Sequence, residues 1–203
     1  MNKSPLDPIQ AREFRQLTWH NPRQVLINYR FVESQLPANM DDRVRRLRTN
    51  ELKNLREGRD AAIFAFGLGE VVLKSDVSIA KSEKSDYDFV VCWSQKEGEY
   101  FYPVQLKELP PDDLNPQVLL EDLYTKVSKY NGPTTISVAI KVNRRMALNY
   151  RPWGEEKKPN INELWLFGCT SQDQSEWFIY GDVLKQDPRF LNFKYPTGVP
   201  SVA

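Results

Sequence analysis

Histidine, cysteine and long apolar runs are scarce in this chain, and each scarcity excludes a class of protein. The only histidine is His20, which rules out metal sites built from several histidines. The two cysteines, Cys92 and Cys169, lie in separate apolar segments and favour buried thiols over a disulfide framework. No apolar run is long enough to span a membrane, and no secretory signal follows Met1. We therefore expect a cytoplasmic protein without membrane contact.

The sequence also lacks an excess of charge of either sign. Lysine and arginine number 28 against 27 aspartates and glutamates, a formal net charge of +1. A strongly basic footprint is therefore absent, so any contact with nucleic acid must come from local clusters. The sequence also lacks a Gly-x-Ser-x-Gly elbow, a P-loop and a dinucleotide fingerprint. A length of 203 residues with 40% hydrophobic content is typical of one folded domain.

The segment 86–108 is the most informative part of the chain, because it predicts a β-hairpin. Its first half, 89–93, is apolar, β-branched and aromatic, and its second half, 100–108, is again strand-like. The polar segment 94–98 between them contains Gly98, which can take the positive φ that suits a hairpin turn.

Polar side chains of this hairpin define a candidate site. Side chains two residues apart share a face of a strand, so Asp86 and Asp88 are expected together, as are Gln105 and Lys107 on the partner strand. If these faces coincide, carboxylate and amide oxygens meet an ammonium group. Oxygen ligands of this kind suit Mg²⁺, and a lysine can orient or deprotonate a water molecule. The alternative is that these residues only occupy a strand entrance and a solvated face.

The segments around the hairpin predict a definite order of elements. A helix capped by Thr49 or Asn50 is expected to run to about Phe66, where Gly67 and Gly69 supply a left-handed C-cap. After the hairpin, helical periodicity and then strict alternation predict a parallel strand–helix–strand unit. The expected order is helix, three strands, helix, strand, over these segments: 49–66, 70–80, 86–93, 100–108, 116–130 and 134–142.

An aspartate that opens an apolar strand, followed by Gln-x-Lys on the next strand, resembles the PD-(D/E)xK nuclease superfamily, and is similar to its Mrr-type branch. The matching residues are Asp88 and Gln105-Leu106-Lys107, and the resemblance covers about residues 48–142. It implies an α/β fold with the restriction endonuclease-like αβββαβ core and a mixed central sheet. It also implies a Mg²⁺- or Mn²⁺-dependent nuclease that favours DNA, and a homodimer as one expected assembly.

The resemblance further implies roles for individual residues. Asp88 and Gln105 would be metal ligands, assisted by Asp86 or by Glu57 from the preceding helix, with Glu70 as a competitor for the role of Glu57. Lys107 would orient or activate water. On the helix that follows, the resemblance places two cations close to this site, where they could contact phosphate or simply be surface lysines: Lys126 and Lys129.

The two ends of the chain extend this core. Residues 1–47 predict an N-terminal helical extension in which Asn21 caps a helix that begins at Pro22. Its arginine cluster could bind phosphate or form a solvated helix face: Arg43, Arg45, Arg46 and Arg48. Residues 48–203 would form the nuclease-like domain, with two further strands at 163–170 and 177–180.

Three hypotheses for function follow. The first is a metal-dependent phosphodiester hydrolase, either endo- or exonuclease. The second is a nucleic-acid- or protein-binding module that keeps the fold without catalysis, because Gln105 replaces an acid and weakens metal binding. The third is a structural partner of a larger complex that docks through its arginine-rich extension.

Overall fold

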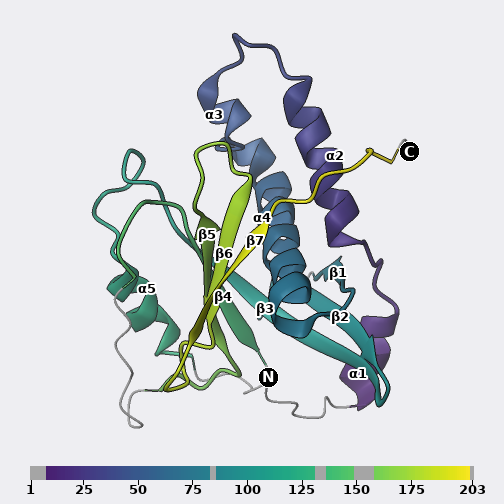
Figure 1. The fold of residues 1–203 in the computed structure, drawn as a ribbon. Helices are drawn as coiled ribbons and strands as arrows, with labels where there is room; N and C mark the ends of the chain where they lie inside the picture. The colour runs from purple at the N-terminus through teal and green to yellow at the C-terminus, as the bar shows by residue number, and fades with distance from the viewer. Residues whose placement is uncertain (1–7, 83–85, 131–135, 149–157, 202–203) are drawn as a thin grey trace.

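The computed structural model describes residues 8–82, 86–130, 136–148 and 158–201, and within them shows a seven-stranded sheet with helices on both faces (Figure 1). The helices are α1 (Pro8–Arg15), α2 (Pro22–Ser34), α3 (Asp42–Arg45), the 3₁₀ turn η1 (Asn50–Leu52), α4 (Lys53–Gly67), the π-helical η2 (Leu68–Leu73) and α5 (Leu120–Val127). The strands are β1 (Ser78–Lys81), β2 (Phe89–Gln95), β3 (Gly98–Leu109), β4 (Ser137–Val142), β5 (Leu164–Cys169), β6 (Glu176–Gly181) and β7 (Arg189–Lys194). The chain is thus an α/β protein, as predicted.

The strands follow one another in the sheet in their order along the chain. Strands β1, β2 and β3 are antiparallel, β3, β4 and β5 are parallel, and β5, β6 and β7 are antiparallel again, so the sheet is mixed. The predicted hairpin is confirmed: Gln95 pairs with Gly98, whose φ is +134°. The predicted parallel pairing of the strands on either side of α5 is confirmed as well.

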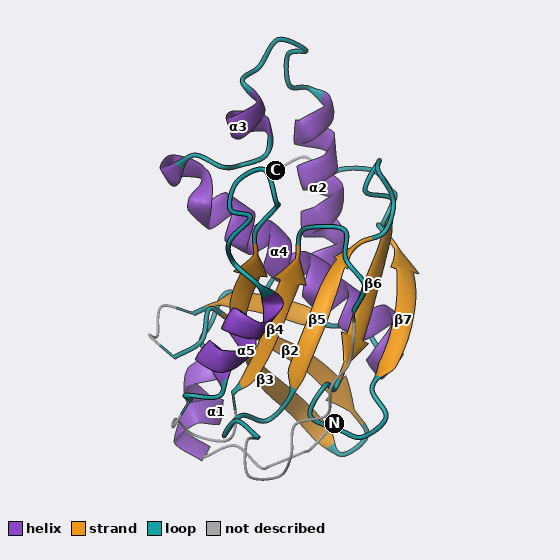
Figure 2. Ribbon diagram, turned by 90° about the vertical axis from the view of Figure 1, so that its left-hand side faces the viewer, coloured by secondary structure: helices purple, strands orange, loops and turns teal. Residues whose placement is uncertain are grey.

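Helices cover the two faces of the sheet unequally (Figure 2). Helix α4 packs on one face with α2 against its outer side, and the largest apolar cluster lies between α4 and the strands. Helix α5 lies on the opposite face over a second cluster. Successive residues of β5 show the alternation, since Leu164 and Leu166 belong to the α5 side and Trp165 and Phe167 to the α4 side. Both faces of the central strands are therefore buried.

The N-terminal helices share the core of the sheet. Asn21 caps α2 as predicted, because its side chain accepts hydrogen bonds from the backbone N–H groups of Arg23 and Gln24. Leu26 of α2 is fully buried in the main cluster. Phe14 of α1 is buried in a third cluster with Tyr87, and their rings meet edge-on at 5.9 Å. Residues 8–34 thus pack directly on the elements that follow.

The predicted strand over residues 70–80 is wrong in its first part. Residues 68–73 instead continue α4 as a π-helical turn, which ends at Lys74 with φ of +55°, and only Ser78–Lys81 form a strand. Val71 and its apolar neighbours pack against the main cluster, so tertiary packing overrides their preference for strand.

The predicted glycine C-cap of α4 is wrong as well, because Gly67 has a right-handed helical φ of −59°. This glycine serves a close approach instead: a Cβ there would lie 2.5 Å from the ring of Phe193 on β7. The residue type was thus informative, but it marked a packing contact and not a helix end.

Two further segments differ from the expectation. The predicted helix over 116–130 begins only at Leu120 and ends at Val127. Strand β7 falls in a segment for which no strand was predicted. The two predicted C-terminal strands are confirmed as β5 and β6. Part of the strand expected from residue 134, and the stop signal at 131–133, lie outside the described residues. No helix in the described segments is both long and apolar enough to cross a membrane.

Candidate functional site

Asp88 and Gln105 are in direct contact at the junction of β2 and β3. The hairpin register pairs Phe89 with Val104, so the residue before β2 lies beside the residue that follows Val104. The Gln105 Nε2 donates to Asp88 Oδ2 at 2.6 Å, and the backbone N–H of Leu106 donates to the same oxygen at 2.6 Å. Gln105 is 9% exposed and Asp88 is half-buried. Strand pairing and two hydrogen bonds therefore fix the Asp88 carboxylate.

Lys107 shares the sheet face of Gln105, since the two residues are two apart on β3. Its Nζ lies 6.0 Å from the centroid of the Tyr130 ring, just after α5, which is within range of a cation–π interaction. Leu109, the next residue on this face, packs in the α5-side cluster. Gln105 and Lys107 therefore lie on the α5 side of the sheet.

Glu57 of α4 meets Asp88 at a shared pocket. Both residues line a hollow of about 190 Å³ between α2, α4 and the first strands, together with His20 and Lys81. Glu57 also forms an ion pair with Lys53 at 3.6 Å. Its predicted competitor Glu70 lies on the π-helical segment and pairs with Arg23 at 3.1 Å. Of the two glutamates, it is thus Glu57 that the structure places at the same pocket as Asp88.

The expected alternation of Asp86 with Asp88 is wrong, because β2 begins only at Phe89. Asp86 is exposed in the turn before the strand. Tyr87 and Val90, three residues apart, belong to one buried cluster, which strict alternation would forbid. Strand geometry therefore does not place Asp86 on the face of Asp88.

The predicted cations form two separate groups. Arg43 and Arg45 lie on α3 and Arg46 follows directly. Arg46 forms ion pairs with two aspartates, and Arg45 donates to two backbone carbonyls. Lys126 and Lys129 are exposed on α5 and just after it, on the opposite side of the sheet from α4. The structure thus does not gather all five cations on one surface.

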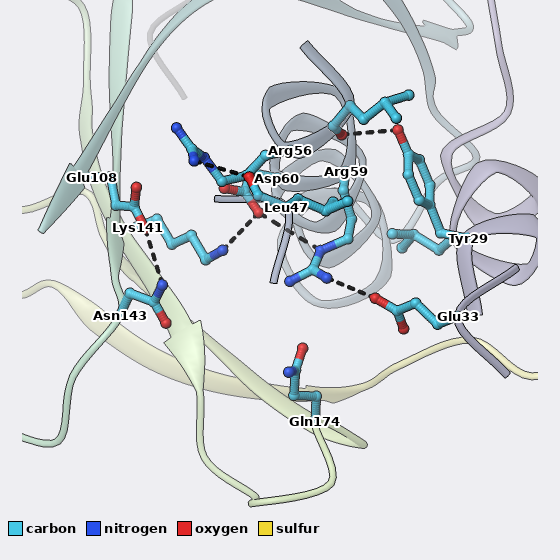
Figure 3. A network of polar contacts seen from close by, with 12 residues as sticks. Tyr29, Glu33, Leu47, Arg56, Arg59, Asp60, Glu108, Lys141, Asn143 and Gln174 are labelled. Atoms are coloured by element: carbon cyan, nitrogen blue, oxygen red, sulfur yellow. Dashed lines mark hydrogen bonds and ion pairs between the residues drawn. The ribbon is translucent and has the colours of Figure 1, made fainter. Parts of the chain in front are cut away.

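Sequence reasoning missed a buried ion pair between α4 and the sheet (Figure 3). Lys141 of β4 and Asp60 of α4 are 4% and 6% exposed, and Lys141 Nζ lies 2.7 Å from Asp60 Oδ1. Arg59 approaches the same carboxylate oxygen at 4.0 Å and bonds Glu33 of α2 at 2.8 Å. The signal in the sequence was a lysine within the otherwise apolar run 138–142. A charge buried in this way requires a partner from elsewhere in the chain.

Electrostatics couple this pair to its neighbours. Burial lowers the pKa of Lys141, and the charge of Asp60 opposes that shift. Arg48 makes two hydrogen bonds to Glu108, at 2.9 and 2.6 Å. Burial alone would raise the pKa of Glu108, but the bonds from Arg48 and the charge of Lys141 outweigh it, so that the pKa lies below the ordinary value. These charges therefore stabilise the junction of α4 with β3 and β4.

The residues that could hold a metal are few. Within the described part of the chain, no group of three or more His, Cys, Asp and Glu side chains is arranged to hold a metal ion. The Gln105 amide contacts the Asp88 carboxylate through its Nε2, and each group also carries an oxygen, the ligand that Mg²⁺ and Mn²⁺ prefer. Among the described residues both hydrogen bonds to the carboxylate fall on Oδ2.

Comparisons of the chain with family models, with curated proteins and with solved structures find no match.

Proposed function

We propose that this protein is a metal-dependent phosphodiester hydrolase, with DNA as the favoured substrate. The single observation that carries the proposal is the contact of Asp88 with Gln105, with Lys107 on the face of Gln105. The observed order of α4, β1, β2, β3, α5 and β4 supports the resemblance to PD-(D/E)xK nucleases, because the three motif residues stand at β2 and on β3.

The donor set fits Mg²⁺ or Mn²⁺. Asp88 would hold the ion through a hard carboxylate oxygen, either with the Gln105 amide oxygen on the α5 side of the sheet or with Glu57, which lines the same pocket as Asp88 on the α4 side. When bound, such an ion polarises a phosphoryl oxygen and lowers the pKa of coordinated water. Asp86, exposed before β2, keeps at most an assisting role in this proposal.

The remaining roles belong to the cations of this chain. The Lys107 ammonium group would orient the attacking water and offset negative charge that develops on the phosphate. Its Nζ lies 6.0 Å from the centroid of the Tyr130 ring, within range of a cation–π interaction. Phosphates of a nucleic-acid strand would be bound by the predicted surface cations, which are Arg43, Arg45 and Arg46 near α3 and Lys126 and Lys129 near α5.

The test is cleavage of supercoiled plasmid, linear duplex, single-stranded DNA and RNA in Mg²⁺, Mn²⁺ or EDTA. We expect metal-dependent cleavage whose rate falls on the order of 10²–10³-fold in Asp88→Asn and in Lys107→Met. Asp76→Asn and Lys96→Met are matched controls, because both residues are exposed and lie outside the site. Absence of cleavage of every substrate, with no Mn²⁺ binding in calorimetry, would contradict the proposal.

A non-catalytic binding module is the second candidate, and one observation favours it. The described residues place a single acid, Asp88, in contact with the Gln-x-Lys motif, and no cluster of three potential metal-binding acids accompanies it. This candidate predicts salt-sensitive binding of nucleic acid without cleavage in either metal. Measuring binding and cleavage on the same substrates separates the two candidates, and sedimentation of the same samples tests the homodimer.

A further inference from the structure

A second concave site lies at the ends of the parallel strands, away from Asp88. It is a cleft of about 490 Å³, which we call the arginine cleft. The residues that line it come from α2, α3, α4 and the ends of β4 and β5, and six are cations: Arg45, Arg46, Arg48, Arg56, Arg59 and Lys141. Clefts at the carboxyl ends of parallel strands are the usual ligand sites of open α/β sheets. The position alone thus makes the arginine cleft a candidate binding site.

Four of these cations are neutralised by carboxylates. Arg48 pairs with Glu108 and Lys141 pairs with Asp60. Arg59 pairs with Glu33. Arg46 forms ion pairs with Asp42 and with Asp113. These pairs position the wall of the cleft, but they leave little charge for a ligand.

The other two cations keep their charge. Arg45 donates only to backbone carbonyls, those of Pro37 and Ala38, at 2.9 and 3.0 Å. Arg56 donates to the carbonyl of Leu47 at 3.1 Å. Among the described residues neither guanidinium forms an ion pair with a carboxylate. A guanidinium has five N–H donors, so each keeps donors as well as a full charge after these bonds. Two oriented, uncompensated arginines in one cleft favour an anionic ligand.

Backbone conformation points to the same place. Leu47 and Gln174 have φ values of +55° and +57°, in the left-handed region that residues with side chains rarely adopt. The Leu47 carbonyl orients Arg56, and Gln174 lines the cleft with its amide directed toward the space between Lys141 and Arg59 (Figure 3). Strained residues of this kind concentrate at ligand sites, where the surrounding structure holds them. A left-handed residue and two arginines without ion-pair partners among the described residues therefore occur at the same cleft.

We propose that the arginine cleft binds a phosphate monoester, either a free mononucleotide-sized molecule or the terminal phosphate of a nucleic-acid strand. The two uncompensated charges match a dianion, and guanidinium forks suit phosphate oxygens. A volume of about 490 Å³ is more than a phosphate needs and lies within the range of small-molecule sites, so the group that carries the phosphate also finds room. The amide of Gln174, which lines the cleft, can supply a neutral donor at its rim, whereas Asn143 Nδ2 already donates to Glu108 at 2.9 Å. The proposal is independent of any hydrolysis at Asp88.

The test is calorimetric titration of the full chain with inorganic phosphate, adenosine 5′-monophosphate, adenosine, and an oligonucleotide with and without a terminal phosphate. We expect inorganic phosphate and the monophosphate to bind and adenosine not to bind, and we expect the oligonucleotide with a terminal phosphate to bind more tightly than the one without. Equal affinity for the monophosphate and the phosphorylated oligonucleotide identifies the free molecule as sufficient, and tighter binding of the oligonucleotide identifies a strand end. Equal binding of adenosine and its monophosphate, or no saturable binding of any phosphate, overturns the proposal.

Variants locate the site. Arg56→Gln and Arg45→Gln are each expected to weaken binding about tenfold or more, because each removes a charge-assisted hydrogen bond. Arg15→Gln is the matched control, since Arg15 pairs with Glu99 outside the cleft. Arg56→Lys is a second variant that keeps the positive charge. It should bind phosphate more tightly than Arg56→Gln, which would show that the charge and not a loss of folding is responsible. Asp88→Asn should bind phosphate as the unmodified chain does. Equal affinities for Arg56→Gln, Arg45→Gln and Arg15→Gln would place the anion elsewhere.

Discussion

Asp88 and Asp60 are both held by a side chain of a central strand, yet they are suited to different tasks. Asp88 accepts from the neutral Gln105 amide of β3 at 2.6 Å, and Asp60 accepts from the Lys141 ammonium of β4 at 2.7 Å. The first bond orients a carboxylate and leaves its charge in place. The second neutralises the carboxylate, so that its charge serves packing between α4 and the sheet. An oriented but unneutralised acid is the one that can attract a cation.

The difference extends to the surroundings of each acid. Asp88 is half-buried and lines a pocket with Glu57. Asp60 is buried, and its partner Lys141 lines a cleft among arginines. The two proposals therefore place a cation site on one flank of α4 and an anion site on another. The following predictions test this contrast, from the largest expected effect to the smallest.

The largest effect is expected on removal of one partner of the buried pair. Lys141→Met leaves Asp60 charged and buried, and we expect the free energy of unfolding in urea to fall by about 3–5 kcal/mol. The double variant Asp60→Leu with Lys141→Met should recover most of that loss, because no charge remains to be buried. Asp88→Asn is the comparison and should cost clearly less. Equal losses for Lys141→Met and Asp88→Asn would show that the two acids do not differ.

Next in size is the ion pair of Glu108 with Arg48. Because the pKa of Glu108 in the folded protein lies below its ordinary value of 4.5, the unfolded chain binds this proton first as pH falls. The stabilisation is therefore fully present above about pH 4.5 and is lost as the pH falls through the lowered pKa. Glu108→Gln should cost about 1.5–3 kcal/mol at neutral pH. Denaturation curves should show the variant and the unmodified chain converging in acid; a gap that persisted there would contradict this assignment.

The third test converts Gln105 into an acid. Gln105→Glu replaces a hydrogen bond to Asp88 by a contact between two carboxylates, and we expect a loss of about 1–2 kcal/mol in EDTA. Mn²⁺ should reverse that loss, because the added carboxylate raises the charge of the ligand set. Gln35→Glu, at the exposed end of α2, is the control and should not respond to Mn²⁺. Thermal unfolding with and without the ion is the measurement, and equal responses of the two variants would argue against a cation site.

The smallest effect is expected at the rim of the arginine cleft. Gln174→Gly removes the side chain from a left-handed residue, and we expect stability to rise by at most about 1 kcal/mol. Affinity for phosphate should fall in the same variant, because the amide at the rim is lost. A gain in stability together with unchanged phosphate affinity would assign the strain at Gln174 to the turn alone.

The hairpin and its neighbours could be predicted because their signals are local. Alternation around Gly98 defined the register of β2 and β3, which brings Asp88 to Gln105, and Asn21 before Pro22 defined the start of α2. The features that the sequence did not predict correctly depend on tertiary contacts. Val71 and its neighbours have the composition of a strand, but they pack as a π-helical turn that ends in a left-handed residue.

The candidate sites show the same division. Asp88 and Gln105 are 17 residues apart and joined by one hairpin, so a local turn is enough to bring them together. Asp60 and Lys141 are 81 residues apart, and only the packing of α4 across the sheet joins them. The arginine cleft gathers residues from several elements that are distant in the sequence in the same way. No local pattern around Arg45 or Arg56 could have indicated that they face one cleft.

Aromatic packing joins α1 to the segment before β2, which carries the candidate cation ligand Asp88. Tyr87 directly precedes Asp88, and its ring rests on Phe14, which also touches Phe101 of β3 at 5.5 Å. A partner protein that pulled α1 from the sheet would release the backbone on which the carboxylate depends. Removal of α1 from the sheet is therefore expected to loosen the backbone segment that positions the Asp88 carboxylate.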